Sequence, residues 1–276
     1  MKTKIRKSTG ERFFDVVNIV FMLFMMLITL YPFLYVVFGS LSMPAEFSKH
    51  TGILFHPIGF QLDAYKVVLK NDDILSGYLN TIIYVSVGTS LSILLTILTA
   101  YVTSRKDLML KSFLIKMMMF TMFFSGGMIP TYLMMQSLGI MGTRFSIILP
   151  GLISVTNVII LRTSFMGIPQ GLEESATMDG ANDFIVLFRI IVPLSMPAIS
   201  VMILFYGVGR WNSWFEAFLY LRDRSLYPLQ LILREILVDN STEVMMVSLG
   251  TLKGQDMSEI IKYATVIVST LPILCI

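Results

Sequence analysis

The sequence predicts an all-α integral membrane protein with six transmembrane helices. Its composition is apolar: 55% of the 276 residues are hydrophobic, 14% are charged, and the mean hydropathy is +0.76. Soluble domains carry about 25% charged residues. Long stretches without any charge also recur along the chain, and about 20 apolar residues suffice for a helix to cross a bilayer.

The composition also argues against several kinds of function. The net charge of +3 is small, and no basic cluster is interleaved with aromatic residues, so we expect no nucleic-acid binding. Cys275 is the single cysteine and cannot form an intrachain disulfide, and no Cys/His spacing indicates a metal site. The chain lacks a glycine-rich phosphate loop, and no nucleophile motif or carboxylate pair lies within an apolar stretch. We therefore expect no catalytic residue, no metal and no cofactor in this chain.

The first transmembrane helix is expected at residues 16–39, which contain no charged residue. The preceding segment 1–15 is rich in lysine and arginine. Basic flanks stay on the cytoplasmic side of a membrane, so the N-terminus is expected in the cytoplasm. A secretory signal peptide is the alternative, but its apolar region is only about 7–15 residues long. A polar outer loop should follow at residues 40–76.

The second and third helices come next. The second is expected at residues 79–103, and the basic residues within 105–116 mark its cytoplasmic end. The third is expected at residues 117–137. It contains Ser125-Gly126-Gly127 and Pro130, which predict close helix packing or a local break.

Three further segments complete the predicted six-helix arrangement. The fourth helix is expected at residues 144–161. The fifth is expected at about 194–218, with Arg210 toward its outer end. A charged outer segment at 222–262 leads to the sixth helix, which begins at 263–276 and is expected to be cut short because a span needs about 20 residues.

A polar stretch between the fourth and fifth helices predicts two short helices with a bend. Pro169 suits the first helical turn, where its missing N–H is not needed. Gly180 can end this helix in the left-handed conformation at little steric cost. Asn182 can cap a second helix over 183–192, and Pro193 should stop it. The predicted topology places this bent loop in the cytoplasm.

The bent loop resembles the EAA loop of ABC importer permeases. That family has Glu-Ala-Ala, three residues, Gly, nine residues, then Ile-x-Leu-Pro. Here Glu174-Ser175-Ala176 is followed at the same spacing by Gly180 and by Ile190-Ile191-Val192-Pro193, with serine for the first alanine and valine for the leucine. Asp179-Gly180-Ala181 also matches the common sugar-importer form. An ordinary cytoplasmic loop is the alternative interpretation.

Shorter matches extend the resemblance. Residues 77–276 look like the type I transmembrane domain of ABC importers, and with the preceding helix they resemble the six-helix permeases of carbohydrate importers, which include the maltose permease subunits. Residues 124–132 and 157–163 look like the LplC/YtcP branch of Gram-positive bacteria. Asn80-Thr81 and Trp211-Asn212 also resemble positions in sugar permeases. Relatives usually complete the sixth helix and add a short cytoplasmic tail.

The resemblance implies a multi-subunit importer in the bacterial cell membrane. Its expected partners are a second permease subunit, two ATPase subunits that bind ATP and Mg, and an extracytoplasmic solute-binding protein that delivers an oligosaccharide. The short helix at 171–179 would dock into a cleft of an ATPase subunit. The coupling residues that the resemblance implies are Glu173, Glu174, Ser175, Ala176, Asp179, Gly180, Ala181 and Pro193.

Candidate residues for the substrate path lie elsewhere. Trp211, Asn212 and Trp214 combine aromatic faces with an amide, which suits sugar rings and their hydroxyls, and Asn80 is added by the resemblance. An aromatic belt at the membrane interface is the alternative for the two tryptophans.

Other functions remain open alternatives at this point. The bent loop does not separate a sugar permease from an ABC permease for amino acids or peptides. A secondary transporter or channel would need ionisable residues at mid-membrane or a broken-helix repeat, and the apolar spans show no such charge. An intramembrane enzyme would need catalytic groups that these spans lack.

Overall fold

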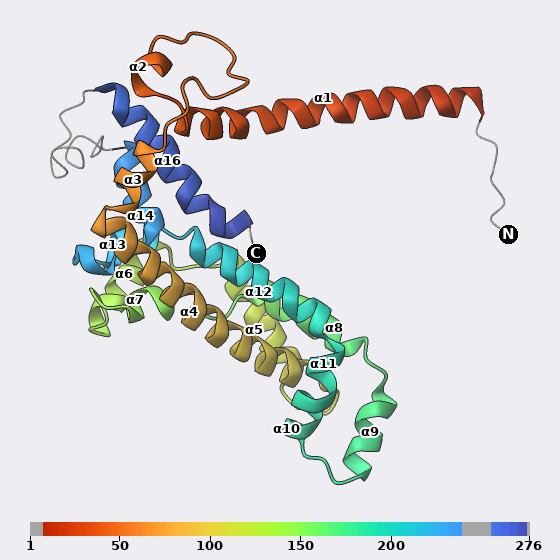
Figure 1. Ribbon diagram of the computed structural model, residues 1–276. Coiled ribbons are helices and arrows are strands. Elements are labelled where there is room, and N and C mark those ends of the chain that lie inside the picture. Colours follow the sequence, from red (N-terminus) through yellow and green to blue (C-terminus); the bar gives the residue numbers. More distant parts are fainter. Residues whose placement is uncertain (1–7, 239–254, 275–276) are drawn as a thin grey trace. The chain divides into compact units, whose positions relative to one another are not determined.

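The computed structural model describes residues 8–238 and 255–274, and within these ranges the chain forms helices and loops but no strand (Figure 1). The chain divides into two units, which we describe separately. One unit combines the residues up to Asn71 with Ile236–Leu271, and the other is built mainly from Asp72–Glu235. The all-α class predicted from the sequence is confirmed for the described residues.

The first unit contains the predicted first helix. Its elements are α1 (Thr9–Ser40), α2 (Pro44–Phe47), α3 (Asp63–Leu69) and most of α16 (Gln255–Leu274). Tyr35, Phe47 and Tyr263 form an edge-to-face cluster with ring centroids 6.0–6.1 Å apart. Gly39 allows this packing, because a Cβ there would lie 2.9 Å from the Tyr263 ring. Within this unit, none of the apolar window of α1 is buried.

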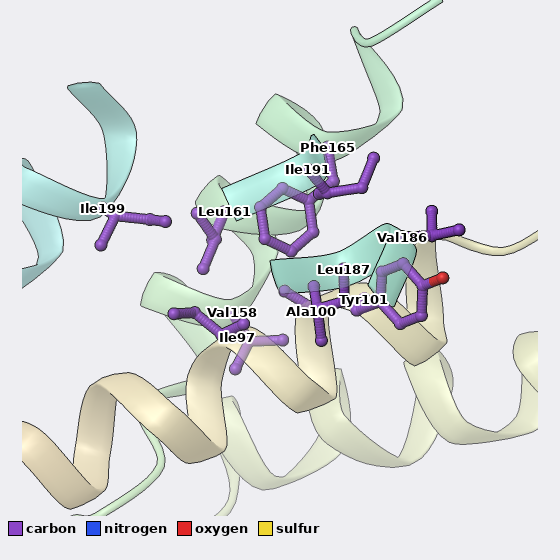
Figure 2. Close-up of a cluster of buried hydrophobic side chains, with 10 residues drawn as sticks. All are labelled: Ile97, Ala100, Tyr101, Val158, Leu161, Phe165, Val186, Leu187, Ile191 and Ile199. Carbon is purple, nitrogen blue, oxygen red and sulfur yellow. The ribbon is translucent and has the colours of Figure 1, made fainter. Parts of the chain in front are cut away.

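The second unit is organised along α4 (Asp72–Ser104), which packs against α8 (Val155–Met166) and α12 (Met196–Trp211). Figure 2 shows the buried core that joins these helices to the bent loop. Close packing of these side chains connects the loop to the helices. The members of this core are Ile97, Ala100, Tyr101, Val158, Leu161, Phe165, Val186, Leu187, Ile191 and Ile199.

The number of spans is only partly supported. In the described part of the chain, α1 and α4 are each long and apolar enough to cross a membrane. Two bent pairs bring the number to four if each pair is one span: α5 (Lys111–Phe123) with α6 (Met128–Ser137), bent by 113°, and 183–194 with α12, bent by 83°.

The third and fourth predicted helices are both interrupted. The third breaks between α5 and α6, where Gly127 has a φ of +85°, as the glycine pair and Pro130 led us to expect. The single helix predicted at 144–161 is wrong. The chain instead forms α7 (Phe145–Ile148) and then α8. Pro150 cannot donate a backbone hydrogen bond, and Gly151 takes a φ of +68°, so a continuous helix cannot pass this point.

The fifth helix also ends earlier than predicted. After α12, residues 212–214 are not helical, and α13 (Phe215–Tyr220) follows. Asn212 donates its side-chain amide to the Val208 carbonyl at 3.0 Å, and the Ser213 hydroxyl donates to Glu216 at 3.2 Å. Side-chain bonds of this kind compete with the helical backbone pattern.

In the described residues, the charged segment predicted at 222–262 is largely helical, and the last helix begins earlier than the predicted residue 263. The segment contains η2 (Arg224–Leu226), α14 (Leu229–Val238) and the start of α16 at Gln255. The apolar face of α14 is buried, including Leu231 and Ile232, while Glu235 forms an ion pair with Arg224 at 2.8 Å. Arg234 and Glu235 therefore belong to an amphipathic helix in the described part of this segment. Asp239 lies outside the described residues.

Candidate functional site

The bent loop begins with α9 (Gln170–Met178), which Pro169 precedes as the N-terminal cap. The helix ends in paired backbone bonds: Gly180 N–H donates to the Thr177 carbonyl at 3.0 Å, and Ala181 N–H donates to the Ala176 carbonyl at 2.9 Å. Gly180 has a φ of +86°, the left-handed conformation that this helix end requires. The prediction for Gly180 is confirmed.

The second arm of the loop starts as predicted and ends differently. The Asn182 side chain accepts the Ile185 N–H at 2.9 Å and caps α10 (Asp183–Val186). However, Pro193 does not stop the helix. A π-helical turn, η1 (Leu187–Ile191), leads into α11 (Val192–Leu194). This wider turn lies directly before Pro193, where a regular α-helix would set the proline ring against a carbonyl. The sharp change of direction comes at Ser195, before α12.

The two faces of α9 have different surroundings. Glu173 and Ala176 are half-buried, and Ala176 packs with Ala181 against the core of Figure 2. Glu174, Ser175 and Asp179 are exposed. The neighbouring glutamates therefore differ in position: Glu173 faces the body of the subunit, and Glu174 is left free for an external contact.

Glu173 is held by an arginine from the end of α4. Arg105 donates from Nη2 to Oε1 of Glu173 at 2.8 Å, and Nη1 donates to the other carboxylate oxygen. The guanidinium also lies over the Tyr101 ring, 4.1 Å from its centroid. Both charged side chains are largely shielded from solvent, so this two-bond pair is worth roughly 1.5–3 kcal/mol. Sequence reasoning used Arg105 only as a marker of topology.

A cleft of about 860 Å³ opens between α9 and the ends of α4 and α8. Its wall includes Glu174, Thr177 and Met178 from α9, and Lys106 bridges it by donating to the Gln170 side chain at 2.7 Å. Lys111 lies on the α5 side and donates to the Arg105 carbonyl at 2.7 Å. These contacts define a polar cleft beside the helix.

The outward surface of the loop carries apolar side chains without partners in this subunit. Met178 is 89% exposed and Phe184 is 67% exposed, and Leu172 is also exposed. Large exposed apolar side chains beside exposed carboxylates are typical of a surface that meets another protein.

The four candidate path residues do not form one cluster. Asn80 is buried and donates to the backbone carbonyls of Ser225 and Tyr227 at 2.7 and 3.2 Å. Trp211 is buried against Tyr78, with ring centroids 6.2 Å apart. Asn212 is exposed, and Trp214 is half-buried. The first pair is therefore packed inside the subunit, whereas the second pair reaches its surface.

Comparison with known proteins places the chain in a family. No protein-family model matches it. It is 39% identical over 267 residues to the polygalacturonan/rhamnogalacturonan transport system permease protein YtcP of Bacillus subtilis (strain 168), with 96% of this chain and 93% of the relative covered. It is 38% identical to the protein LplC of the same organism, with 99% and 92% covered. The chain belongs to the LplC/YtcP family of ABC-importer permeases.

A solved structure agrees with this assignment. The chain matches a subunit of a bacterial ABC transporter involved in the import of the acidic polysaccharide alginate, with a TM-score of 0.90 and 30% identity over 98% of this chain and 96% of that one. The resemblance inferred from the EAA-like loop is thereby confirmed at the level of the family and the fold. As an LplC/YtcP-family permease, the chain is a transport subunit and not an enzyme.

Proposed function

We propose that this chain is a permease subunit of an ATP-driven bacterial importer for oligosaccharides that carry carboxylates. The observation that carries the proposal is that two relatives matched over nearly their whole length are named for acidic polysaccharides, polygalacturonan and alginate. Neither name points to amino acids or peptides, the alternative that the loop motif left open.

In the proposed assembly, the chain crosses the cytoplasmic membrane six times with its N-terminus inside and forms half of the translocation path. A second permease forms the other half, two ATPase subunits bind ATP and Mg, and an extracytoplasmic protein delivers the substrate. The wholly exposed apolar window of α1 supports contact with lipid or a partner subunit, because apolar surface of that length is not left in water.

The coupling role is assigned to the bent loop. Its outer face would dock on the ATPase through Glu174, with the small Ser175 side chain allowing close approach. Its inner face would pass the movement to α4 through the pair of Glu173 with Arg105 and through Ala176 packed on the core. Asp179, Gly180, Ala181 and Pro193 would shape the bend. Rigid-body movement needs a stiff connection of this kind.

Reconstitution of the complete importer in liposomes tests the substrate proposal. The complex of both permeases, the ATPase subunits and the binding protein would be supplied with ATP inside and one labelled solute outside. We expect uptake of oligogalacturonides or oligo-alginate, and no uptake of peptides of similar mass. Uptake of peptides or of neutral oligosaccharides, with none of either acidic sugar, would contradict it.

A further inference from the structure

The Arg210 guanidinium lies against the middle of α4. Its place in the sequence predicted only a position near the outer end of a helix. In the structure it lies in the last turn of α12, and a Cβ added to Gly88 would lie 2.7 Å from its guanidinium carbon. Gly88 is the midpoint of the 33-residue α4, about 24 Å from either end at 1.5 Å per residue.

A charged group therefore reaches the middle of a helix that is long and apolar enough to cross a membrane. Position along α12 does not reveal this, because the next residue, Trp211, packs on Tyr78 nearer the start of α4, while the long Arg210 side chain extends to Gly88. A cation at such depth is costly, and in membrane proteins such groups generally face a bundle interior or a polar cavity and have a function.

The hydrogen bonds of Arg210 are few and mostly long. Nη2 donates to the Ser92 hydroxyl at 3.0 Å, while Nη1 donates to the carbonyls of Ile147 and Ile148 at 3.4 Å each. The buried Nε–H has no hydrogen-bond partner. The guanidinium thus uses only some of its N–H donors in hydrogen bonds to α4 and α7.

No carboxylate neutralises this guanidinium by an ion pair in the part of the chain that the structure describes. Glu216 on α13 lies within electrostatic range, but its carboxylate accepts the Ser213 hydroxyl at 3.2 Å. Arg105 in the same unit shows the contrast, because a bidentate carboxylate occupies it. Arg210 has the same planar set of N–H donors but no carboxylate bound to it.

Neutral polar groups lie further along α4, up to Thr96, which is about 12 Å from Gly88. The hydroxyls of Tyr206 and Thr96 are hydrogen-bonded to each other at 2.8 Å. The Tyr206 hydroxyl also accepts the backbone N–H of Ser154 at 3.0 Å. Ser154 ends the non-helical segment between α7 and α8, and backbone of that kind is tolerated at membrane depth only inside protein or along a polar cavity. Hydroxyls and a cation along one stretch of α4 are the groups that a sugar carrying a carboxylate would need.

We propose that Arg210 is a carboxylate-binding site in the translocation path, taking the uronate group of an acidic oligosaccharide as it crosses the membrane. This inference rests on the proposed function, since it names the group that selects the acidic substrate. Gly88 has no side chain to exclude the guanidinium from its place beside α4. The two long carbonyl bonds are the contacts that a ligand carboxylate would replace. A single cation with incomplete bonds attracts the uronate without holding it permanently, which transport requires.

The test compares an acidic substrate with a neutral one of the same length. The complete importer in liposomes would be given an oligogalacturonide or its carboxyl-reduced analogue, each at a concentration that saturates the binding protein. Arg210→Gln removes the charge, and Arg210→Lys is the matched variant that retains it. Complex assembly and ATPase stimulation by the loaded binding protein would be measured for each.

We expect Arg210→Gln to lower uptake of the acidic substrate about tenfold or more relative to the neutral one, because a charge-assisted bond is lost, while Arg210→Lys keeps most of the preference. An equal fall for both substrates, or loss of assembly in both variants, would show that Arg210 only braces α4 against α7 and would overturn the inference. If the unmodified importer takes up the neutral analogue but neither acidic sugar, the proposed function itself fails, which is a distinguishable result.

Discussion

Glu173 and Glu174 are adjacent in the sequence and both line the cleft beside α9, but they differ in burial and in partners. Glu173 is bound to Arg105 within the subunit, and Glu174 is exposed. Only Glu174 is therefore free to accept charge-assisted hydrogen bonds from a docking protein, and the two residues form a natural matched pair for substitution.

We expect Glu174→Ala to weaken ATPase docking by roughly 1.5–3 kcal/mol, the worth of a hydrogen bond to a charged group, and to leave the fold unchanged. Copurification of the ATPase with the permease, and uptake per ATP hydrolysed, would measure this. A merely solvated Glu174 near the helix N-terminus would cost only about 0.3–1 kcal/mol of helix stability, so full docking and uptake in the variant would contradict the coupling role.

Gly180 is needed for its backbone conformation and not for space. A Cβ at this position would meet nothing within 4 Å, but the φ of +86° costs an ordinary L-residue about 1–2 kcal/mol. Gly180→Leu should therefore misdirect the second arm and lower coupling, while Gly180→Asn should be milder because asparagine tolerates this region. The control is Gly171→Ala in the open face of α9. ATPase stimulation equal in all three variants would count against a role for the bend.

At the scale of elements, the sequence predicted what short-range chemistry determines. The cap at Asn182 and the helix end at Gly180 depend on neighbouring residues, and both were predictable. The sequence also indicated the break in the predicted fourth helix, at Pro150 and Gly151. However, the apolar length of residues 144–161 favoured a single helix. The length of the second arm was not predictable, because a π-helical turn before Pro193 has no simple local signature.

The pairing of Arg105 with Glu173 lay beyond sequence reasoning for a different reason. The two residues are far apart in the chain, and only the packing of α4 and α8 on the core brings them together. Without that packing, Arg105 was indistinguishable from any basic residue at a cytoplasmic helix end. Glu173, Ala176 and Ala181 on the inner face were thus among the predicted residues, but the partner Arg105 was missed.

Charge exchange tests whether this pair connects α9 to α4. Arg105→Glu and Glu173→Arg should each uncouple ATP hydrolysis from uptake, since each places like charges together. The double variant should recover a large part of the coupling, with an interaction energy within the 0.5–3 kcal/mol range seen for residues in contact. Additive losses in the double variant would mean that the pair does not transmit movement.

At the scale of the whole molecule, the proposed topology places the loop 40–76 outside and the bent loop inside. In a background with Cys275→Ser, single cysteines at His50, Asp239 and Glu174 would be exposed to a membrane-impermeant thiol reagent in intact cells. We expect labelling at His50 and Asp239, and labelling at Glu174 only after permeabilisation. External labelling at Glu174 would overturn the orientation that the basic residues predict.

Oxidation of the exposed Met178 thioether can measure whether the proposed docking surface is covered by the ATPase. Oxidation of methionine to the sulfoxide follows accessibility, and this side chain is 89% exposed. Brief peroxide treatment followed by peptide mass spectrometry should therefore oxidise Met178 readily in the isolated permease and slowly once the ATPase covers α9, without any substitution in the protein. Equal oxidation rates in the two forms would show that the ATPase leaves this end of α9 uncovered. If the oxidation rate of Met178 differed between nucleotide states, it would show when in the transport cycle the ATPase contacts this end of α9.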